Sequence, residues 1–312
     1  MVDAALQRAR VTAEDDAEGL ARRRRRGRLG LRFWLPVGWI GLVLFFAITA
    51  DLWPLPAPDT MDFLSTAAPP GTVGEIEMAG GDGKFAEFRY LLGTDNLGRD
   101  ILTRLIHGAR VSLTIGLVSP LIGLLLGGAL GVLAGYYRGR VESVVVAAMD
   151  IVLAFPALAL LLAITFYLGP TLLNLILALG FLSIPASARV ARANTLSLAN
   201  REFVLAAKAM GASDLYILVR EIVPNVVMPL IVFAMLLVAV LIVAEGTLSF
   251  LGLSVPPPTA SWGTMIEEGR ERLDDTPHIT MIPAAAMCLT VLSFNLIGDR
   301  LRGLIDPREG KL

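Results

Sequence analysis

The sequence contains little of what most enzyme and metal sites require. One cysteine, Cys288, is present among 312 residues, which excludes an intrachain disulfide and a cysteine-based metal site. The two histidines, His107 and His278, have no companion ligands, and no nucleophile stands in a recognisable pairing with a base. We therefore predict no catalytic residue, no metal site and no enzymatic activity for this chain.

Charge is also scarce. Only 18% of the residues are charged and 55% are hydrophobic, with a mean hydropathy of +0.66. A typical soluble domain has about a quarter of its residues charged. This composition predicts an integral membrane protein.

Six apolar segments are long enough to cross a membrane, since about 20 helical residues span the hydrocarbon core. They are residues 33–53, 111–135, 144–168, 171–190, 222–250 and 279–298. The turn signal Gly169-Pro170 separates the third from the fourth and makes the pair a tight hairpin. We predict an all-α fold with six transmembrane helices.

The distribution of lysine and arginine predicts the orientation. Alternate connecting segments 1–32, 136–143, 189–221 and 299–312 hold 20 of the 27 basic residues, and the others hold 7. Because basic residues accumulate on the cytoplasmic side, both termini are expected in the cytoplasm. We predict five consecutive parts: a cytoplasmic Arg-rich segment 1–32, a first transmembrane helix 33–53, an extracytoplasmic loop 54–110, a five-helix core 111–298 and a cytoplasmic tail 299–312.

The Arg-rich segment has alternative interpretations. Basic residues before an apolar run are typical of a signal peptide, but residues 33–50 are longer than the usual apolar region and Ile48 is a poor cleavage residue. We predict a retained helix. The run of arginines could bind nucleic acid or anionic lipid, but next to a membrane span we interpret it as a positive-inside anchor, with no nucleic-acid partner.

The extracytoplasmic loop begins Pro-rich, and its first half is predicted to be irregular. Near its end, Ile101, Leu105 and Ile106 recur at helical spacing opposite Arg104. This pattern predicts a helix at the membrane surface or against the bundle.

A glycine-rich stretch of the same loop, GGDGKF, superficially resembles a nucleotide-binding loop. The phosphate-binding motif requires glycine where Met78 stands and serine or threonine where Phe85 stands. The chain therefore has no ATP site of its own.

A polar segment, EFVLAAKAMGASDLYILVREIVPN, interrupts the apolar runs at residues 202–225. Its Ala206, Ala207, Gly211 and Pro224 stand at the spacing of the cytoplasmic Ala-Ala-x3-Gly…Pro motif, and the segment resembles that of the membrane subunits of bacterial ABC importers. Four further stretches restrict the resemblance to one family of these importers: LLGTDNLGRDILTRLIHGARVSL, AGYYRG, LSFLGLSVPPPTASWG and NLIGDRLRGLIDPR. From about residue 32 to 308, the chain resembles the C-type permease of the dipeptide/oligopeptide/nickel importer family.

The resemblance implies a type I ABC importer permease fold, in which a cytoplasmic coupling helix near residues 201–216, between the fourth and fifth spans, docks on a separate ATPase. Its implied contact residues are Glu202, Phe203, Ala206, Ala207, Met210, Gly211 and Leu215. On a continuous helix, one stripe would contain Phe203, Ala207, Gly211 and Leu215, with the two small residues allowing close approach. Replacement of Gly211 by Ala is then expected to be mild, because alanine favours helices. The alternative is an amphipathic helix at the membrane interface.

The resemblance also implies partners in a bacterial cytoplasmic membrane: a homologous B-type permease, two ABC ATPase subunits or a fused pair, an extracytoplasmic substrate-binding protein and membrane lipid. ATP and Mg would be bound by the ATPase subunits, so no cofactor is expected in this chain. The resulting function is one half of the translocation pathway for di- or oligopeptides or a related small solute. The alternative, a self-sufficient secondary transporter or channel, usually shows an internal repeat or titratable residues along a path, and neither is visible.

Two carboxylates lie within the predicted spans. Asp150 is expected to form a structural ion pair with Arg189 and Arg192 across the hairpin, because an unpaired charge in a membrane is costly. Glu245 could line the pathway or hydrogen-bond neighbouring backbone, and we favour the second role.

Small residues recur in the second span. Gly127, Gly131 and Gly135 stand four residues apart, which favours close contact between helices. The partner helix could belong to this chain or to a second permease.

Overall fold

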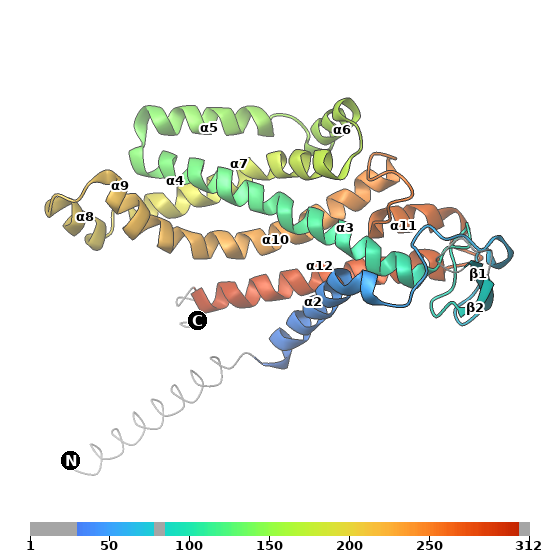
Figure 1. Ribbon diagram of the computed structural model, residues 1–312. Helices are drawn as coiled ribbons and strands as arrows, with labels where there is room; N and C mark the ends of the chain where they lie inside the picture. Colours follow the sequence, from blue (N-terminus) through green and yellow to red (C-terminus); the bar gives the residue numbers. More distant parts are fainter. Residues whose placement is uncertain (1–29, 78–84, 306–312) are drawn as a thin grey trace, which may run out of the picture.

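The computed structural model describes residues 30–77 and 85–305. Long helices run roughly lengthwise, with α8 and α9 at one end and β1, β2 and α11 at the other (Figure 1). The helical elements are α2 (Leu31–Thr49), η1 (Ala50–Leu52), η2 (Phe63–Ser65), α3 (Ile101–Ile122), η3 (Gly123–Gly127), α4 (Gly128–Tyr137), α5 (Gly139–Leu153), α6 (Ala157–Leu168), α7 (Leu172–Leu198), α8 (Glu202–Ala209), α9 (Asp214–Tyr216), η4 (Ile217–Ile222), α10 (Val223–Phe250), α11 (Trp262–Gly269), η5 (Arg270–Arg272) and α12 (His278–Ile305). Residues 1–29 of the predicted Arg-rich segment and residues 306–312 of the predicted C-terminal tail lie outside the described residues.

Five continuous helices have the length and hydropathy to cross a membrane. They are Phe33–Leu52, Ile101–Tyr137, Leu172–Leu198, Asp214–Phe250 and His278–Gly303. A sixth crossing requires α5 and α6 together, and these helices are bent by 81° at their junction. The prediction of a mostly helical membrane protein is therefore confirmed, with five or six candidate spans.

The bend between α5 and α6 was not expected from the apolar run 144–168. Helix α5 ends at Leu153, and Pro156 caps the start of α6. Proline has no backbone N–H and disfavours the helical conformation of the residue before it, so the helix breaks here. The predicted turn at Gly169-Pro170 lies between α6 and α7, where Gly169 has a φ of +85°.

The helix predicted near residues 101–110 is present, but it is not a separate element. It forms the first turns of α3, which continues through η3 and α4 to Tyr137. Asp100 caps the helix, because its carboxylate accepts a hydrogen bond from the Thr103 backbone N–H at 2.9 Å. Arg104 is only 1% exposed, so it does not mark a solvent-facing side as the sequence pattern indicated.

The glycine ladder of the second span packs within the chain. A Cβ atom on Gly127 would clash with the Ile184 carbonyl oxygen, and one on Gly131 would clash with the Ala188 carbonyl oxygen. Both carbonyls belong to α7. Small residues thus let η3 and α4 lie directly on α7, which decides between the two partners that the sequence left open.

A small β-hairpin interrupts the otherwise helical fold. Strands β1 (Val73–Glu77) and β2 (Phe85–Arg89) pair antiparallel, with Val73 opposite Arg89. Two strands alone are marginally stable, so the hairpin needs support from its surroundings. The Tyr90 hydroxyl, just after β2, donates to the Asp62 carboxylate at 3.2 Å, and burial together with this carboxylate raises the pKa of Tyr90.

Candidate functional site

The polar segment 202–216 folds as two short helices. Helix α8 ends at Ala209, and Gly211 follows with a φ of +80°. The Ala212 N–H donates to the Ala207 carbonyl and the Gly211 N–H to the Lys208 carbonyl, both at 3.0 Å. This is a Schellman motif, in which a left-handed glycine ends the helix. The expected continuous stripe is therefore wrong, because Gly211 and Leu215 do not lie on α8.

One face of α8 packs on the bundle. Val204 and Ala207 are buried in a cluster that also contains Tyr136, Ile217 and Leu218. Ala207 was expected to allow a partner to approach, but it faces its own chain. Its small side chain instead lets α8 lie close to the start of the long helix formed by α9, η4 and α10.

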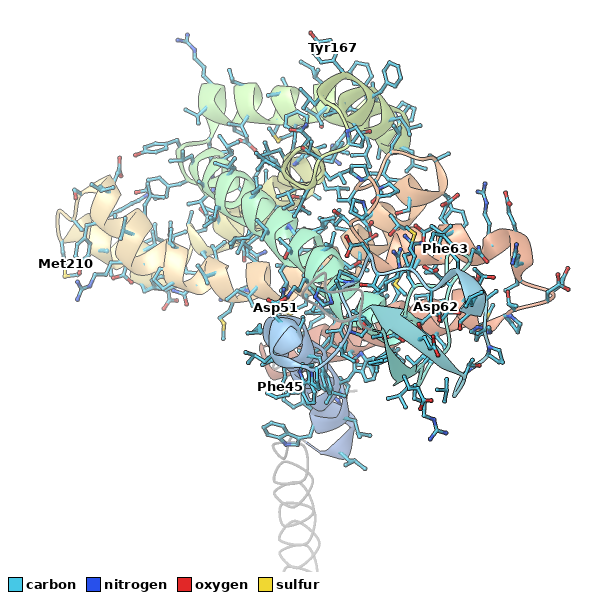
Figure 2. The ribbon with its side chains drawn as sticks, turned by 45° about the vertical axis from the view of Figure 1, so that its right-hand side comes forward. Phe45, Asp51, Asp62, Phe63, Tyr167 and Met210 are labelled. Atoms are coloured by element: carbon cyan, nitrogen blue, oxygen red, sulfur yellow. The ribbon has the colours of Figure 1, made fainter. Side chains whose placement is uncertain are left out.

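The opposite face of the segment carries exposed apolar side chains. Met210 is 82% exposed and lies at the tip of the segment (Figure 2). The other large exposed apolar side chains of this region are Phe203, Leu205, Leu215, Tyr216 and Val219. Glu202, Ala206 and Gly211 are exposed as well. We call the side chains of Phe203, Leu205, Met210 and Leu215 the apolar tip.

Side-chain contacts hold the segment to the end of α4. The Tyr136 hydroxyl donates to the Asp214 carboxylate at 2.6 Å, and the Lys208 ammonium lies 4.9 Å from the centroid of the Tyr136 ring. Arg138 donates to the Asn200 side chain at 3.1 Å. These contacts fix α8 to the bundle, while Met210 of the apolar tip stays largely exposed.

The structure brings Asp150 and Arg189 together, with 2.6 Å between Oδ1 and Nη2. Arg192 does not join them as expected; it contacts the carboxylate of Glu142. Glu142 and Asp150 stand eight residues apart on α5, so they lie on the same side of the helix. That spacing was the signal for a second pair between α5 and α7.

Glu245 is fully buried near the end of α10. Its Oε1 atom accepts hydrogen bonds from the hydroxyls of Ser254 at 2.6 Å, Ser261 at 2.7 Å and Ser249 at 3.2 Å. The expected partners were backbone groups, so the role of these serine side chains was missed. Serines 249, 254 and 261 stand in LSFLGLSVPPPTASWG, which the sequence singled out only as part of a motif.

A charged cluster at the hairpin end was also missed. Arg99 donates to Asp95 at 2.6 Å and to Glu268 at 2.7 Å, and Arg104 donates to Glu268 at 2.8 Å. The two arginines are almost completely buried. Because Asp95 and Arg99 precede α3 and Glu268 belongs to α11, the cluster attaches the extended loop to both helices. Asp95 and Arg99 lie in a turn before α3 and not on a helix, so their spacing did not signal the pair.

Comparison with known proteins identifies the family. The family described as "Binding-protein-dependent transport system inner membrane component" matches residues 127–311. The chain belongs to this family. It is a permease subunit of an ABC importer and a multi-pass protein of the inner membrane, as the sequence resemblance predicted. Such subunits have no ATPase activity, and the alternative of a self-sufficient secondary transporter is set aside.

Relatives of this permease are similar over most of its length. It is 42% identical over 219 residues to the glutathione transport system permease protein GsiD of Pectobacterium atrosepticum, covering 70% of this chain and 73% of the relative. It is 41% identical over 220 residues to the di/tripeptide transport system permease protein DppC of Pseudomonas aeruginosa, again covering 70% of this chain and 73% of the relative. The fold is similar to an inward-facing structure of the MetNI methionine ABC transporter, with a TM-score of 0.55, 19% identity, and coverage of 66% of this chain and 98% of the other.

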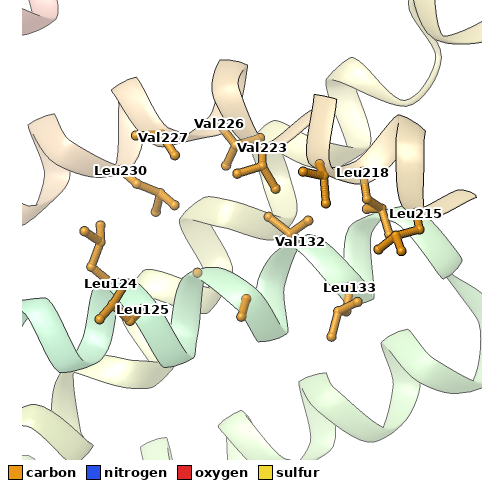
Figure 3. A pocket seen from close by; sticks show the side chains of 13 residues that line it. Leu124, Leu125, Val132, Leu133, Leu215, Leu218, Val223, Val226, Val227 and Leu230 are labelled. Atoms are coloured by element: carbon orange, nitrogen blue, oxygen red, sulfur yellow. The ribbon is translucent and has the colours of Figure 1, made fainter. Parts of the chain in front are cut away.

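The permease has an apolar cavity of about 390 Å³ between η3–α4 and the η4–α10 helix (Figure 3). Leucine, valine, alanine and glycine make up its lining: Leu124, Leu125, Gly128, Ala129, Val132, Leu133, Leu215, Leu218, Val219, Val223, Val226, Val227 and Leu230. Ligand sites for polar molecules need a few placed polar groups to fix orientation. This cavity supplies no side chain that could recognise a peptide amine or carboxylate.

Proposed function

We propose that the chain is the C-type subunit of a peptide importer and forms half of its translocation pathway with a homologous B-type permease. Two ATPase subunits, or a fused pair, bind ATP and Mg on the cytoplasmic side. A substrate-binding protein delivers the solute on the other side. Both termini are cytoplasmic in this proposal, which follows the distribution of basic residues.

The observation that carries the proposal is the apolar tip. It lies on a segment with charged residues, at the opposite end of the molecule from the β-hairpin (Figure 1). Exposed apolar side chains gathered on a polar surface are typical of a contact with another protein. The proposed partner is the ATPase, and the contact residues are Glu202, Phe203, Ala206, Met210, Gly211 and Leu215, with Ala207 supporting α8 from behind.

The geometry supports transmission of motion from this contact into the membrane. Helix α8 is held to α4 by the contact of Lys208 with the Tyr136 ring, and to the start of the long helix by the burial of Val204 and Ala207. That long helix runs without a break from Asp214 to Phe250. Closure of the ATPase subunits on ATP would therefore displace α8 and the long helix together. The difference in ATP affinity between two conformations supplies the drive for alternating access.

The proposed substrate class is small peptides, including glutathione. It rests on the similarity to the glutathione permease and the di/tripeptide permease. In this proposal the binding protein selects the solute and the permease conducts it. The Asp150–Arg189 pair has a structural role in this proposal, joining α5 to α7.

Replacement of Met210 tests the coupling role. Met210→Arg places a charge at the most exposed apolar position of the tip, so we expect the chain to insert normally while ATP-driven uptake falls at least about tenfold, as for a buried interface anchor. Met210→Leu is the matched control and should retain uptake. The measurement is uptake of glutathione and tri-alanine by proteoliposomes that contain the whole transporter. Normal, tightly coupled uptake by Met210→Arg would contradict the proposal.

A further inference from the structure

The hydroxyl groups around Glu245 come from several parts of the chain. Ser249 lies on α10, one turn after Glu245. Ser254 belongs to the loop after α10, and Ser261 is the N-cap residue of α11. One carboxylate oxygen thus gathers three hydroxyl groups at the end of the molecule where the β-hairpin lies.

The start of α11 packs directly on α10 beside this carboxylate. A Cβ atom on Gly263 would lie 2.8 Å from the Gly246 Cα atom and 3.1 Å from Glu245 Oε2. The Trp262 backbone N–H donates to the Ser112 hydroxyl of α3 at 3.1 Å, and the Trp262 ring N–H donates to the Leu105 carbonyl at 3.0 Å. Helices α3, α10 and α11 therefore meet at Glu245 with no room for a larger residue at 263.

Glu245 accepts the hydrogen bonds that join the parts of this junction. All three side-chain hydrogen bonds end on its Oε1 atom, and Oε2 has no partner within residues 30–77 and 85–305. A buried hydroxyl that loses its acceptor keeps its desolvation cost without the compensating bond. Removal of Oε1 would leave the Ser254 hydroxyl without an acceptor and so weaken the attachment of the loop to α10, whereas Ser249 keeps the Glu245 carbonyl and Ser261 keeps the Thr264 hydroxyl as partners.

The junction links two surfaces at opposite ends of the permease. Towards one end, the helix that contains Glu245 reaches Asp214, which is tied to Tyr136 beside α8. Towards the other, α11 carries Glu268, which pairs with Arg99 and Arg104 and so holds the loop that bears the hairpin. Side-chain contacts therefore run from the apolar tip to the hairpin end, and Glu245 joins the two halves of this path.

We propose that Glu245 is a positioning residue that fixes the segment 251–269 to α10, so that docking of the binding protein at the hairpin end is transmitted to the ATPase subunits. This inference rests on the proposed function, which places the ATPase at the apolar tip. The effect of Glu245 is exerted through Ser254 and Ser261.

The test uses the whole transporter in lipid nanodiscs and compares ATP hydrolysis with and without its purified binding protein, supplied with glutathione and tri-alanine. For Glu245→Ala we expect unchanged basal hydrolysis and loss of the acceleration by the binding protein. The double variant Ser254→Ala, Ser261→Ala should behave in the same way, because it removes two donors from the other side of the junction. Glu245→Gln should retain the acceleration, since its carboxamide oxygen takes the place of Oε1. Thr247→Ala, two residues along α10 and bonded only to the Val243 carbonyl, is the matched control.

The outcomes separate this inference from the proposed function. Full acceleration in Glu245→Ala or in the double serine variant would overturn the role of Glu245 alone. Equal loss of basal and accelerated hydrolysis in both variants would also overturn it, because a merely structural residue lowers both. If Glu245→Ala fails to assemble, the double serine variant decides. Absence of acceleration in the unmodified transporter would overturn the proposed function together with this inference.

Discussion

At the scale of single residues, buried carboxylates with different neighbours have different tasks. Asp95 is held by a buried arginine, and Glu245 by hydroxyl groups. Asp100 caps α3 through its Oδ2 atom, which accepts from the Thr103 N–H and hydroxyl, at 2.9 and 2.6 Å. Burial raises the pKa of Asp100 despite these bonds. Its ionised form is therefore less stable in the folded protein than in the unfolded chain.

This pKa shift predicts a pH dependence that Asp100→Asn should remove. A carboxyl group with a raised folded pKa favours folding fully below its unfolded pKa of about 3.9, and the contribution is lost as pH rises through the folded pKa. Asparagine still caps the helix but does not titrate. The melting temperature of the wild type should thus fall relative to that of Asp100→Asn as pH rises from about 4 to neutral. Asp100→Ala, which neither caps nor titrates, should be about 0.5–2 kcal/mol less stable than Asp100→Asn at every pH.

At the scale of elements, short interruptions decide where helices point. Pro156 separates α5 from α6, and Gly211 ends α8 in a left-handed conformation. Without the break at Gly211, α8 would continue and Met210 would no longer stand at the tip. The interruption is what exposes the apolar side chains that we propose to meet the ATPase.

Substitution of Gly211 by Ala should therefore be harmful, contrary to the expectation for a glycine inside a helix. A left-handed conformation costs a residue with a Cβ atom about 1–2 kcal/mol. We expect faster hydrogen exchange of the α8 amides in Gly211→Ala. Gly303→Ala is the control, since Gly303 lies on a helix with open space around it and without a positive φ. Equal protection of α8 in wild type and Gly211→Ala would contradict the Schellman assignment.

At the scale of the whole molecule, the two ends differ in construction. The hairpin end is held by buried ion pairs, as between Arg104 and Glu268. The opposite end presents the apolar tip. The five or six candidate spans lie between them. This division suits a permease that meets a binding protein at one end and ATPases at the other.

Cysteine labelling tests the proposed orientation of the two ends. Leu64 is 95% exposed at the hairpin end and Met210 82% exposed at the other. With Cys288 replaced by serine, Leu64→Cys should react with an impermeant maleimide in intact cells, because that end is proposed to be extracytoplasmic. Met210→Cys should react only after the inner face of the membrane is opened. Labelling of Met210→Cys in intact cells would contradict the proposed orientation.

The sequence by itself determined the properties that depend on composition and local order. A long apolar run must be helical in a membrane, so most spans followed from hydropathy alone. The spacing of Ala206, Ala207, Gly211 and Pro224 was enough to identify the family, because recognising a motif requires only the order of its residues and not their conformation. The residues at Met78 and Phe85 likewise predicted that this chain has no ATP site of its own.

Only the tertiary structure decided which residues face one another. Ala207 faces its own bundle, Arg192 pairs with Glu142 rather than Asp150, and the ion pair of Arg104 with Glu268 joins residues 164 positions apart. Helical spacing places residues on one side of a helix, but it does not say which neighbour covers that side. Burial of a charge such as Arg104 depends on the packing of distant segments, and those contacts leave no periodic signal in the sequence, unlike the four-residue glycine spacing of the second span.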